Sequence, residues 1–111
     1  MPDFYPTISA PSRIDGLGWL YILQSADGSF YVGQTLDLAE RLRKHRFGLG
    51  SKHTREHGNP RLIYYEGPMS LPAAVSSEAQ LNGWSRAKKA ALIRGDLQVL
   101  SALSQSRERR P

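Results

Sequence analysis

Two runs of aromatic and β-branched residues, one on each side of a Gly-containing turn, constrain the fold most strongly. The runs cover residues 19–23 and 30–32, and Ala26-Asp27-Gly28 lies between them. Aromatic and β-branched side chains favour extended strands, and an Asp-Gly step between two such runs is typical of a hairpin turn. The pattern therefore predicts two antiparallel strands.

The register of this hairpin decides which side chains share a face of the sheet. A three-residue loop with Gly28 in the left-handed conformation places Tyr21 opposite Gly33 and Tyr31 opposite Leu23. Side chains alternate between faces, so both tyrosines are expected on one face, whereas a two-residue loop would separate them. The tyrosines are either ordinary sheet aromatics or part of a site. The open space expected beside Tyr21 at Gly33 favours a site.

Turn and cap residues divide the rest of the chain. Thr35 is expected to cap the first helix, which Gly48-Leu49-Gly50 ends. The third strand is expected to end before Gly67-Pro68, and Ser85 and Gly95 bound a later helix. In chain order the expected elements are a helix over residues 36–47, a strand over 62–65, and helices over 70–83, 86–94 and 97–103.

The order of these elements predicts an α+β fold, with a small three-stranded antiparallel sheet flanked by helices. The order is ββαβαα plus a short C-terminal helix. We expect an extended or disordered arm over residues 1–17, which contain three prolines and no hydrophobic period. The folded domain is expected over residues 18–95, and a short helix with a charged tail over residues 96–111.

Composition excludes several kinds of chemistry. The chain has 111 residues, a formal net charge of +5 and no cysteine, which excludes disulfides, thiolate metal sites and a cysteine nucleophile. No apolar run reaches the roughly 20 residues that cross a bilayer, and the first residues lack the pattern of a secretory signal. We therefore expect one cytoplasmic domain that does not bind membranes. Its positive charge indicates a polyanionic partner such as nucleic acid, or merely a basic protein.

The first predicted helix carries two candidate site residues beside its apolar stripe. Leu38 and Leu42 mark the buried stripe, His45 falls beside Leu38, and Arg41 lies toward the flank. Arg41 and His45 are four residues apart, so their side chains are neighbours on the helix surface. They are either functional, or Arg41 extends along the edge of the core while His45 packs as a neutral ring.

The second predicted helix places a carboxylate where an apolar residue is expected. Its apolar stripe is Leu71, Ala74, Val75 and Leu81, and Glu78 falls within it. Carboxylates are rarely buried unless they are paired or bind metal. Glu78 therefore either forms an ion pair, with Arg41 as the obvious candidate, or binds a divalent cation. A lone acid fits a one-metal site, because Mg²⁺ is often held by one or two carboxylates, waters and substrate phosphates.

Together these residues resemble the GIY-YIG endonuclease family, over about residues 18–95. The likeness is greatest to the small stand-alone bacterial members related to the N-terminal domain of the repair nuclease UvrC. The matching motifs are Tyr21-Ile22-Leu23, Asp27 through Thr35, Asp37 through His45, Lys52-His53-Thr54, Leu62 through Glu66, Glu78 through Trp84 and Lys88 through Ile93.

The resemblance implies a nuclease that hydrolyses DNA with one Mg²⁺ per site, for which Mn²⁺ can substitute. Tyr21 and Tyr31 match the tyrosines of the two family motifs, and Arg41 matches the catalytic arginine. His45 matches a histidine often found one turn later, and Glu78 matches the metal-binding glutamate. The implied fold, a three-stranded antiparallel sheet with flanking helices, agrees with the pattern of elements.

These assignments lead to a specific expectation for the chemistry. Arg41 would stabilise charge on a non-bridging phosphate oxygen while Glu78 holds the metal. Tyr21 is the candidate to orient the attacking water and accept its proton. Free tyrosine has a pKa of about 10, so Arg41 and the metal would have to lower that pKa. Tyr31 would contact the water or phosphate, and His45 could share in proton transfer.

Positive residues outside this set are expected to follow the nucleic-acid backbone, with little sequence preference. They are Arg43, Lys44, Arg46, Lys52, Arg55, Arg86, Lys88 and Lys89. Cleavage is then expected to be structure-specific or non-specific, in DNA repair or processing. RNA as substrate and a partner protein that supplies specificity both stay open.

Two other classes of function are compatible with the sequence. One is a nucleic-acid-binding module that keeps the scaffold without turnover. The other is a structural domain in which Arg41 and Glu78 are only an ion pair. Metal dependence separates the nuclease from both alternatives.

Overall fold

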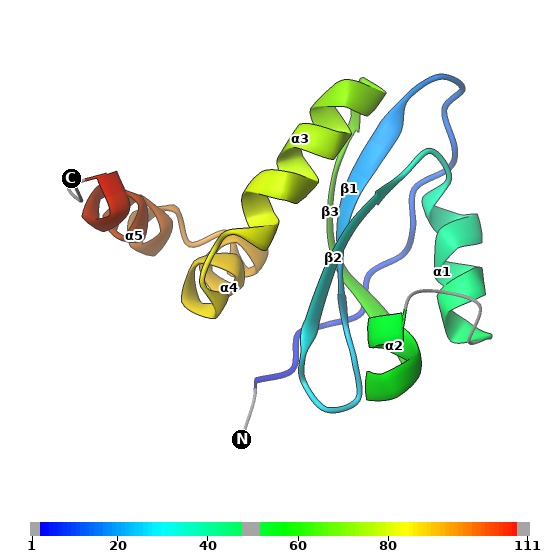
Figure 1. Cartoon of the computed structure of the whole chain (residues 1–111), viewed down its shortest axis with the longest axis horizontal. Coiled ribbons are helices and arrows are strands. Elements are labelled where there is room, and N and C mark those ends of the chain that lie inside the picture. Colours follow the sequence, from blue (N-terminus) through cyan, green and yellow to red (C-terminus); the bar gives the residue numbers. More distant parts are fainter. Residues whose placement is uncertain (1–2, 48–51, 109–111) are drawn as a thin grey trace. The chain divides into compact units, whose positions relative to one another are not determined.

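A computed structural model describes residues 3–47 and 52–108 of the chain. It divides into two units, residues 1–79 and residues 80–111. The first unit contains the strands β1 (Gly18–Gln24), β2 (Phe30–Thr35) and β3 (Arg61–Met69), the helices α1 (Leu38–Arg46) and α2 (Lys52–His57), and most of α3 (Leu71–Asn82). The second contains the end of α3, α4 (Arg86–Arg94) and α5 (Leu97–Glu108). These elements confirm the predicted α+β fold (Figure 1).

The three strands form one antiparallel sheet in the order β2-β1-β3. The predicted hairpin register is confirmed, because Tyr21 pairs with Gly33 and Leu23 pairs with Tyr31. Gly28 has a φ of 88°, as the three-residue loop requires. Both tyrosines therefore lie on one face of the sheet.

The third strand is longer than predicted. β3 continues through Gly67 and Pro68 to Met69, and the Gly67-Pro68 peptide is cis. Pro68 is tolerated because β3 is an edge strand, where an amide donor can be dispensed with. Gly67 packs closely on β1, since a Cβ there would lie 2.9 Å from the Gly18 carbonyl oxygen and 2.9 Å from Trp19 Cε3. The Gly-Pro pair therefore continues this strand instead of ending it.

Helix α1 begins two residues later than expected. Asp37, not Thr35, is the N-cap, and its carboxylate accepts a hydrogen bond of 3.1 Å from the Glu40 amide. The Thr35 hydroxyl accepts from the Asp37 amide at 3.2 Å, so it supports the cap from outside the helix. The helix ends at Arg46, and Phe47 is its C-cap. The predicted Gly48-Leu49-Gly50 stop lies outside the described residues.

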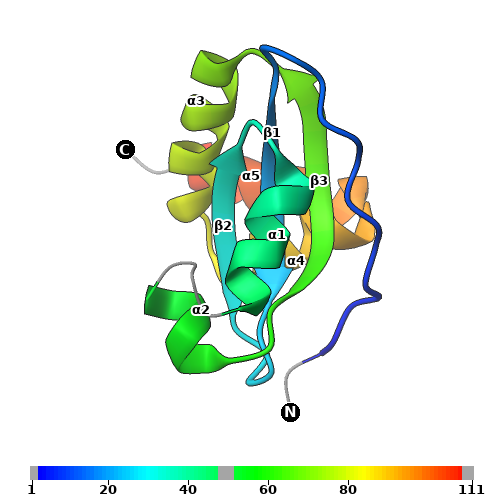
Figure 2. The same ribbon diagram turned by 90° about the vertical axis from the view of Figure 1, so that its right-hand side faces the viewer.

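Helix α1 packs on the face of the sheet that carries the tyrosines (Figure 2). The buried cluster on this side consists of Trp19, Tyr21 and Leu23 from β1, Leu38 and Leu42 from α1, and Leu62 from β3. Alternation along β1 sends its odd-numbered side chains to this face. The apolar stripe of α1 covers them, as the helical period predicts.

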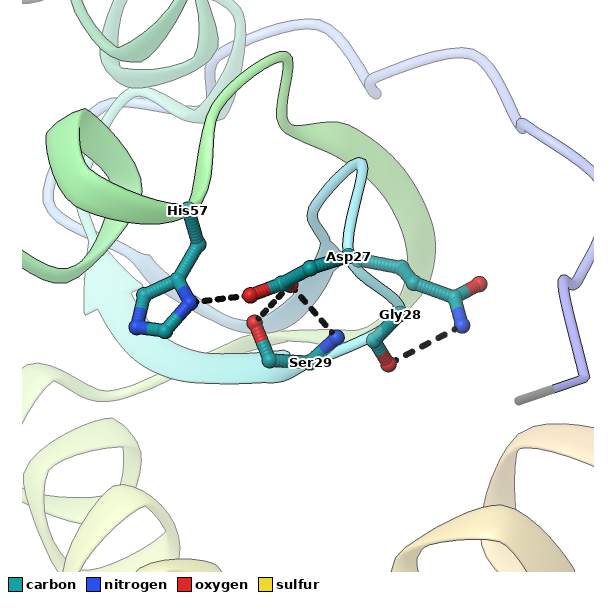
Figure 3. A network of polar contacts seen from close by, with 5 residues as sticks. Asp27, Gly28, Ser29 and His57 are labelled. Carbon is teal, nitrogen blue, oxygen red and sulfur yellow. Dashed lines mark hydrogen bonds and ion pairs between the residues drawn. The ribbon is translucent and has the colours of Figure 1, made fainter. Parts of the chain in front are cut away.

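Helix α2 has no counterpart in the predictions, because its six residues show no hydrophobic period. It ends at His57, whose Nδ1 contacts the Asp27 carboxylate in the hairpin loop (Figure 3). The same carboxylate accepts from the Ser29 hydroxyl at 2.7 Å and the Ser29 amide at 3.0 Å. Those Ser29 and His57 contacts hold the pKa of Asp27 well below its usual range.

The N-terminal arm runs along β3 (Figure 2) and has no helix or strand of its own over residues 3–14. The Ile8 amide donates to the Leu62 carbonyl at 2.9 Å. The buried Gln24 amide accepts from the Tyr5 amide at 3.0 Å and donates to the carbonyls of Asp3 at 2.7 Å and Gly28 at 3.2 Å. The side chain of Gln24 thus fastens the arm to the hairpin.

In the second unit, α4 has its predicted boundaries. The Ser85 hydroxyl accepts from the Lys88 amide at 3.2 Å, and Gly95 ends the helix with a φ of 70°. Helix α5 extends to Glu108 and is longer than the short helix expected. Among the described residues, no helix is long and apolar enough to cross a membrane.

We expect Gln24→Met to release the arm while keeping the volume of the buried side chain. The variant loses three buried or part-buried hydrogen bonds of the Gln24 side chain. The free energy of unfolding should fall by about 2–3 kcal/mol, measured by urea denaturation, and the Tyr5 amide should lose protection from hydrogen exchange. Gln80→Met, at an exposed position, is the control and should unfold like the wild type.

Candidate active site

Tyr21 occupies the centre of the site and is fully buried, with 0% of the residue exposed. Its ring lies across Gly33 on the neighbouring strand. A Cβ added to Gly33 would lie 2.5 Å from both Cζ and Oη of Tyr21. The open space predicted beside the hydroxyl is therefore filled by the Tyr21 ring, which corrects that expectation and explains why a glycine is needed there.

Three aromatic rings meet on this face of the sheet. Tyr21 and Tyr31 have ring centroids 6.2 Å apart, and His45 lies 6.2 Å from Tyr21 and 5.3 Å from Tyr31. The Tyr21 hydroxyl lies 3.3 Å from His45 Nε2, within hydrogen-bond distance. The hairpin register and the helical period thus bring together three of the predicted site residues.

His45 reaches the tyrosines because it shares the inner face of α1 with Leu38 and Leu42, as predicted. It is only 3% exposed. Burial, with a smaller effect from the positive charge of Arg41, lowers the pKa of His45 to about 4. The ring is therefore neutral at pH 7, and with its proton on Nδ1 it can accept the Tyr21 O–H at Nε2.

Arg41 joins the cluster from the same helix, one turn before His45. The positive charge of Arg41, close to the Tyr21 hydroxyl, lowers the pKa of that hydroxyl. Burial and the neighbouring Tyr31 act in the opposite direction and outweigh it, so the net pKa of Tyr21 is raised. We expected Arg41 and a metal ion to lower the pKa of Tyr21 enough for it to act as a base. Without the metal, Arg41 does not lower it below the usual value of a tyrosine. Tyr21 is a neutral hydroxyl at physiological pH.

Glu78 lies on α3 and is half-buried. Its negative charge contributes to the raised pKa of Tyr21, so it acts on the same cluster. Within residues 3–47 and 52–108, Glu78 and Arg41 make no ion pair within 4.0 Å. The ion pair considered from the sequence is therefore not formed.

The buried stripe of α3 is narrower than predicted. Ala74 is fully buried and faces Gly18, where an added Cβ would lie 3.3 Å from Ala74 Cβ. Leu71 and Val75, expected on the same stripe, are 39% and 49% exposed. Glu78 therefore follows Ala74 by one turn at the edge of the buried face, where a carboxylate can still reach solvent.

The donor set fits a loosely held divalent cation. No group of three or more His, Asp or Glu side chains that could enclose a metal occurs in the part of the chain described. A single half-buried carboxylate suits Mg²⁺, which keeps several waters and binds through one or two carboxylates and substrate phosphates. It does not suit zinc, which takes three or four protein ligands.

Arg41 also borders an open cavity of about 400 Å³ at the end of β2 and the start of α1. Its lining includes the cations Arg41, Lys44 and Arg13 and the acids Asp37 and Glu40. Tyr21, Tyr31 and Glu78 are not among the lining residues. Arg41 therefore acts on the buried Tyr21 and also lines an open cavity in which three cations outnumber two acids.

Arg13 was not predicted, because nothing in the arm sequence distinguishes it. The hairpin register is the one sequence signal that could have indicated where the end of the arm lies. Trp19 pairs with Thr35, so the residues that enter β1 had to pass close to the residues that leave β2. That pairing placed the end of the arm beside α1.

The residues predicted to follow the nucleic-acid backbone differ in exposure. Arg43, Lys44, Arg46, Lys52 and Arg86 are exposed, and the side chain of Arg55 lies outside the described part. Arg43 is engaged by Glu40 in two contacts of 2.6 and 3.1 Å, which lower the pKa of Glu40. Lys52 lies 3.8 Å from Glu56.

In the second unit, α4 carries Lys88 and Lys89. Lys88 is only 7% exposed, and its ammonium lies 4.1 Å from the centroid of the Trp84 ring. Lys88 is therefore the most buried of the predicted backbone-binding cations whose burial the structure describes. Lys89 is half-buried, and burial together with Arg86 lowers its pKa.

Comparison with known proteins decides the family. The model of the GIY-YIG catalytic domain matches residues 17–91, which include all five residues of the site. The chain belongs to the GIY-YIG nuclease family. The resemblance inferred from the tyrosine motifs is thereby confirmed.

Relatives of this GIY-YIG protein include several proteins named UPF0213. One from Streptococcus sanguinis is 40% identical over 81 residues, which cover 73% of this chain and 93% of that protein. Another, from Haloquadratum walsbyi, is 35% identical over 71 residues, 64% of this chain and 80% of that one. The solution NMR structure of UPF0213 protein BH0048 from Bacillus halodurans is 37% identical, covers 70% of this chain and 83% of its own, and has a TM-score of 0.47.

We expect the stability of this GIY-YIG protein to fall in mild acid because of His45. The folded-state pKa of about 4 lies below the value near 6.5 of the unfolded chain, so the unfolded state binds the proton more strongly between these values. The free energy of unfolding should therefore decrease as the pH falls through this window, by about 2 kcal/mol between pH 7.5 and pH 5 from this residue.

Urea denaturation of wild type and His45→Gln at both pH values isolates this effect, because carboxyl groups titrate alike in the two proteins. The wild type should lose more stability than His45→Gln between pH 7.5 and pH 5. Equal losses in the two proteins would show that His45 is not held neutral by burial.

We expect Gly33→Ala to disturb both fold and site. The new methyl group would overlap the buried Tyr21 ring, and overpacking of this kind costs about 1–3 kcal/mol. Urea denaturation measures the loss. Gly83→Ala is the matched control, since the nearest atom to its added Cβ is 3.5 Å away, and a change within about 0.5 kcal/mol is expected. Unchanged stability of Gly33→Ala would contradict the placement of the ring.

Proposed function

We propose that this protein is a metal-dependent endonuclease that hydrolyses phosphodiester bonds in DNA, with structure-specific or non-specific cleavage. The single observation that carries the proposal is the meeting of Tyr21, Tyr31, His45 and Arg41 within the residues matched by the GIY-YIG catalytic domain. DNA repair or processing, and kinship with the nuclease domain of UvrC, belong to the same proposal.

Arg41 is the residue that contacts the substrate in this proposal. Arg41 lines the open cavity, and its charge also acts on the Tyr21 hydroxyl. A fixed guanidinium can donate to a non-bridging phosphate oxygen and stabilise the charge that develops there during hydrolysis. Since Arg41 makes no ion pair within 4.0 Å in the part of the chain described, its charge is available to a phosphate.

Tyr21 acts as a positioning residue and not as the base. It is fully buried and its pKa is raised, so it remains a neutral hydroxyl in the protein without metal and can donate to His45. The neutral His45 ring completes the chain of contacts from the core to the guanidinium. Tyr31 is half-buried and is the tyrosine of the pair with access to solvent, so it is our candidate to contact the attacking water.

Glu78 would hold the divalent cation from the edge of α3. When bound, Mg²⁺ or Mn²⁺ supplies Lewis-acid stabilisation of the phosphate and of the leaving oxygen. The carboxylate is half-buried and not committed to Arg41, so it is available for this purpose in the described part of the chain.

A binding module without turnover is the second candidate. A cavity lined by three cations and a tyrosine that stays neutral would serve binding as well as cleavage. The two functions differ in their dependence on a divalent cation, because backbone binding by Lys and Arg does not need one.

We expect the protein to nick supercoiled plasmid with Mg²⁺ or Mn²⁺ and not with EDTA. Arg41→Gln and Glu78→Gln should each lower the rate by about 10²–10³-fold, the usual loss when one charge-stabilising group is removed. Glu56→Gln, an exposed acid on α2, is the matched control and should cleave like the wild type. Circular dichroism checks that each variant is folded.

A folded wild type that binds DNA but leaves plasmid, flap and branched DNA intact with either metal would favour the binding module. Metal-dependent nicking that survives both substitutions would show a nuclease whose centre lies elsewhere.

A further inference from the structure

We propose that Arg13, on the N-terminal arm, binds a second phosphate of the DNA backbone beside the phosphate at Arg41. The inference rests on the proposed function and deepens it, because it assigns part of substrate binding to a segment before the matched catalytic domain, which begins at residue 17. The cavity of about 400 Å³ that Arg13 and Arg41 both line is the observation that points to it.

The arm is held against the first unit at several points before it reaches Arg13. The Ile8 amide donates to the Leu62 carbonyl at 2.9 Å, and Ala10 packs against the buried cluster under α1. After Arg13, the Leu17 amide donates to the Ile14 carbonyl at 3.1 Å and closes a turn. Arg13 therefore lies between two anchored stretches of backbone, which limits the backbone entropy lost when Arg13 binds a ligand.

The sheet register explains why this position faces the start of α1. Trp19 pairs with Thr35, so the residues leading into β1 lie beside the residues leading out of β2. The end of β2 and the start of the connection to α1 line the cavity with Gln34, Thr35 and Leu36. Arg13 comes to this space from the arm, and Arg41 and Lys44 come to it from α1.

The acids that line the cavity are already occupied. The Asp37 carboxylate caps α1 through the Glu40 amide at 3.1 Å. The Glu40 carboxylate is paired with Arg43 at 2.6 Å. The cations Arg41 and Lys44 make no ion pair within 4.0 Å among the residues described. The cavity thus offers positive charge to an anion.

Arg13 is itself accessible. Its side chain is 54% exposed, and its only ion pair in the described part is with Asp15, at 3.7 Å. Asp15 is 99% exposed, and such exposed pairs are weak and readily exchanged. A DNA phosphate can take the place of Asp15, because phosphate oxygens accept two parallel hydrogen bonds from a guanidinium and the present pair is long and exposed.

The test is the salt dependence of binding of a DNA duplex to the full-length protein in EDTA, where cleavage does not occur. Each phosphate contact contributes about −0.9 to the slope of log affinity against log salt. Arg13→Gln should therefore flatten the slope by about 0.9 and weaken binding about five- to tenfold at 0.1 M salt. Arg13→Lys keeps the charge and should keep most of the slope.

Arg94→Gln is the matched control for net charge, because it removes an exposed arginine from α4, away from the arm in sequence. It should leave the slope closer to that of the wild type than Arg13→Gln does. An equal change in Arg13→Gln and Arg94→Gln would overturn the inference, because the effect would then reflect net charge alone.

The outcomes separate this inference from the proposed function. A wild type that binds and nicks DNA, with Arg13→Gln unchanged in slope and affinity, overturns the contribution of Arg13 and leaves the nuclease intact. A wild type that neither binds nor nicks DNA overturns both. A flatter slope in Arg13→Gln, with metal-dependent nicking retained at high protein concentration, supports both.

Discussion

The Tyr21 ring lies across Gly33 with no room for a Cβ between them, and the site is arranged around that contact. The contact requires the three-residue hairpin loop, because any other parity would turn one tyrosine to the opposite face of the sheet. It also requires the apolar face of α1 to pack on the sheet. Leu38 and Leu42 bury the Tyr21 ring there, and His45 contacts the Tyr21 hydroxyl from the same helix. The position of the buried Tyr21 hydroxyl therefore depends on Gly33, on the three-residue hairpin loop and on the apolar face of α1.

Burial determines the chemistry open to that hydroxyl. Tyr21 has Arg41 beside it, yet the loss of solvation and the neighbouring Tyr31 outweigh the guanidinium, so its pKa is raised. The same burial lowers the pKa of His45, and both groups are uncharged at neutral pH. With Tyr21 and His45 neutral, Arg41 carries the positive charge of this cluster, and Arg41 also lines the open cavity. In this account Arg41 contacts the substrate and the aromatic residues position it.

Local patterns predicted most of this arrangement. The hairpin register, the inner face of α1 and both ends of α4 follow from turn chemistry and periodicity, and each is confirmed. The continuation of β3 through Gly67-Pro68 and the half-buried position of Glu78 depend on tertiary packing against β1. The pKa of Tyr21 is raised because burial outweighs the positive charge of Arg41. The relative size of these two effects cannot be predicted from a sequence pattern. Arg13 reaches the cavity through an arm whose path is set by contacts with Gln24 and Leu62.

The ionisation of Tyr21 tests the central claim most directly. A protein labelled with ¹³C at tyrosine Cζ reports each hydroxyl separately in an NMR titration, and a Tyr21→Phe variant assigns the signal. We predict that Tyr21 stays protonated beyond pH 10, near which a free tyrosine ionises, for as long as the protein remains folded. Ionisation of Tyr21 near neutral pH in the folded protein would contradict the account, because the tyrosine could then serve as the base in hydrolysis.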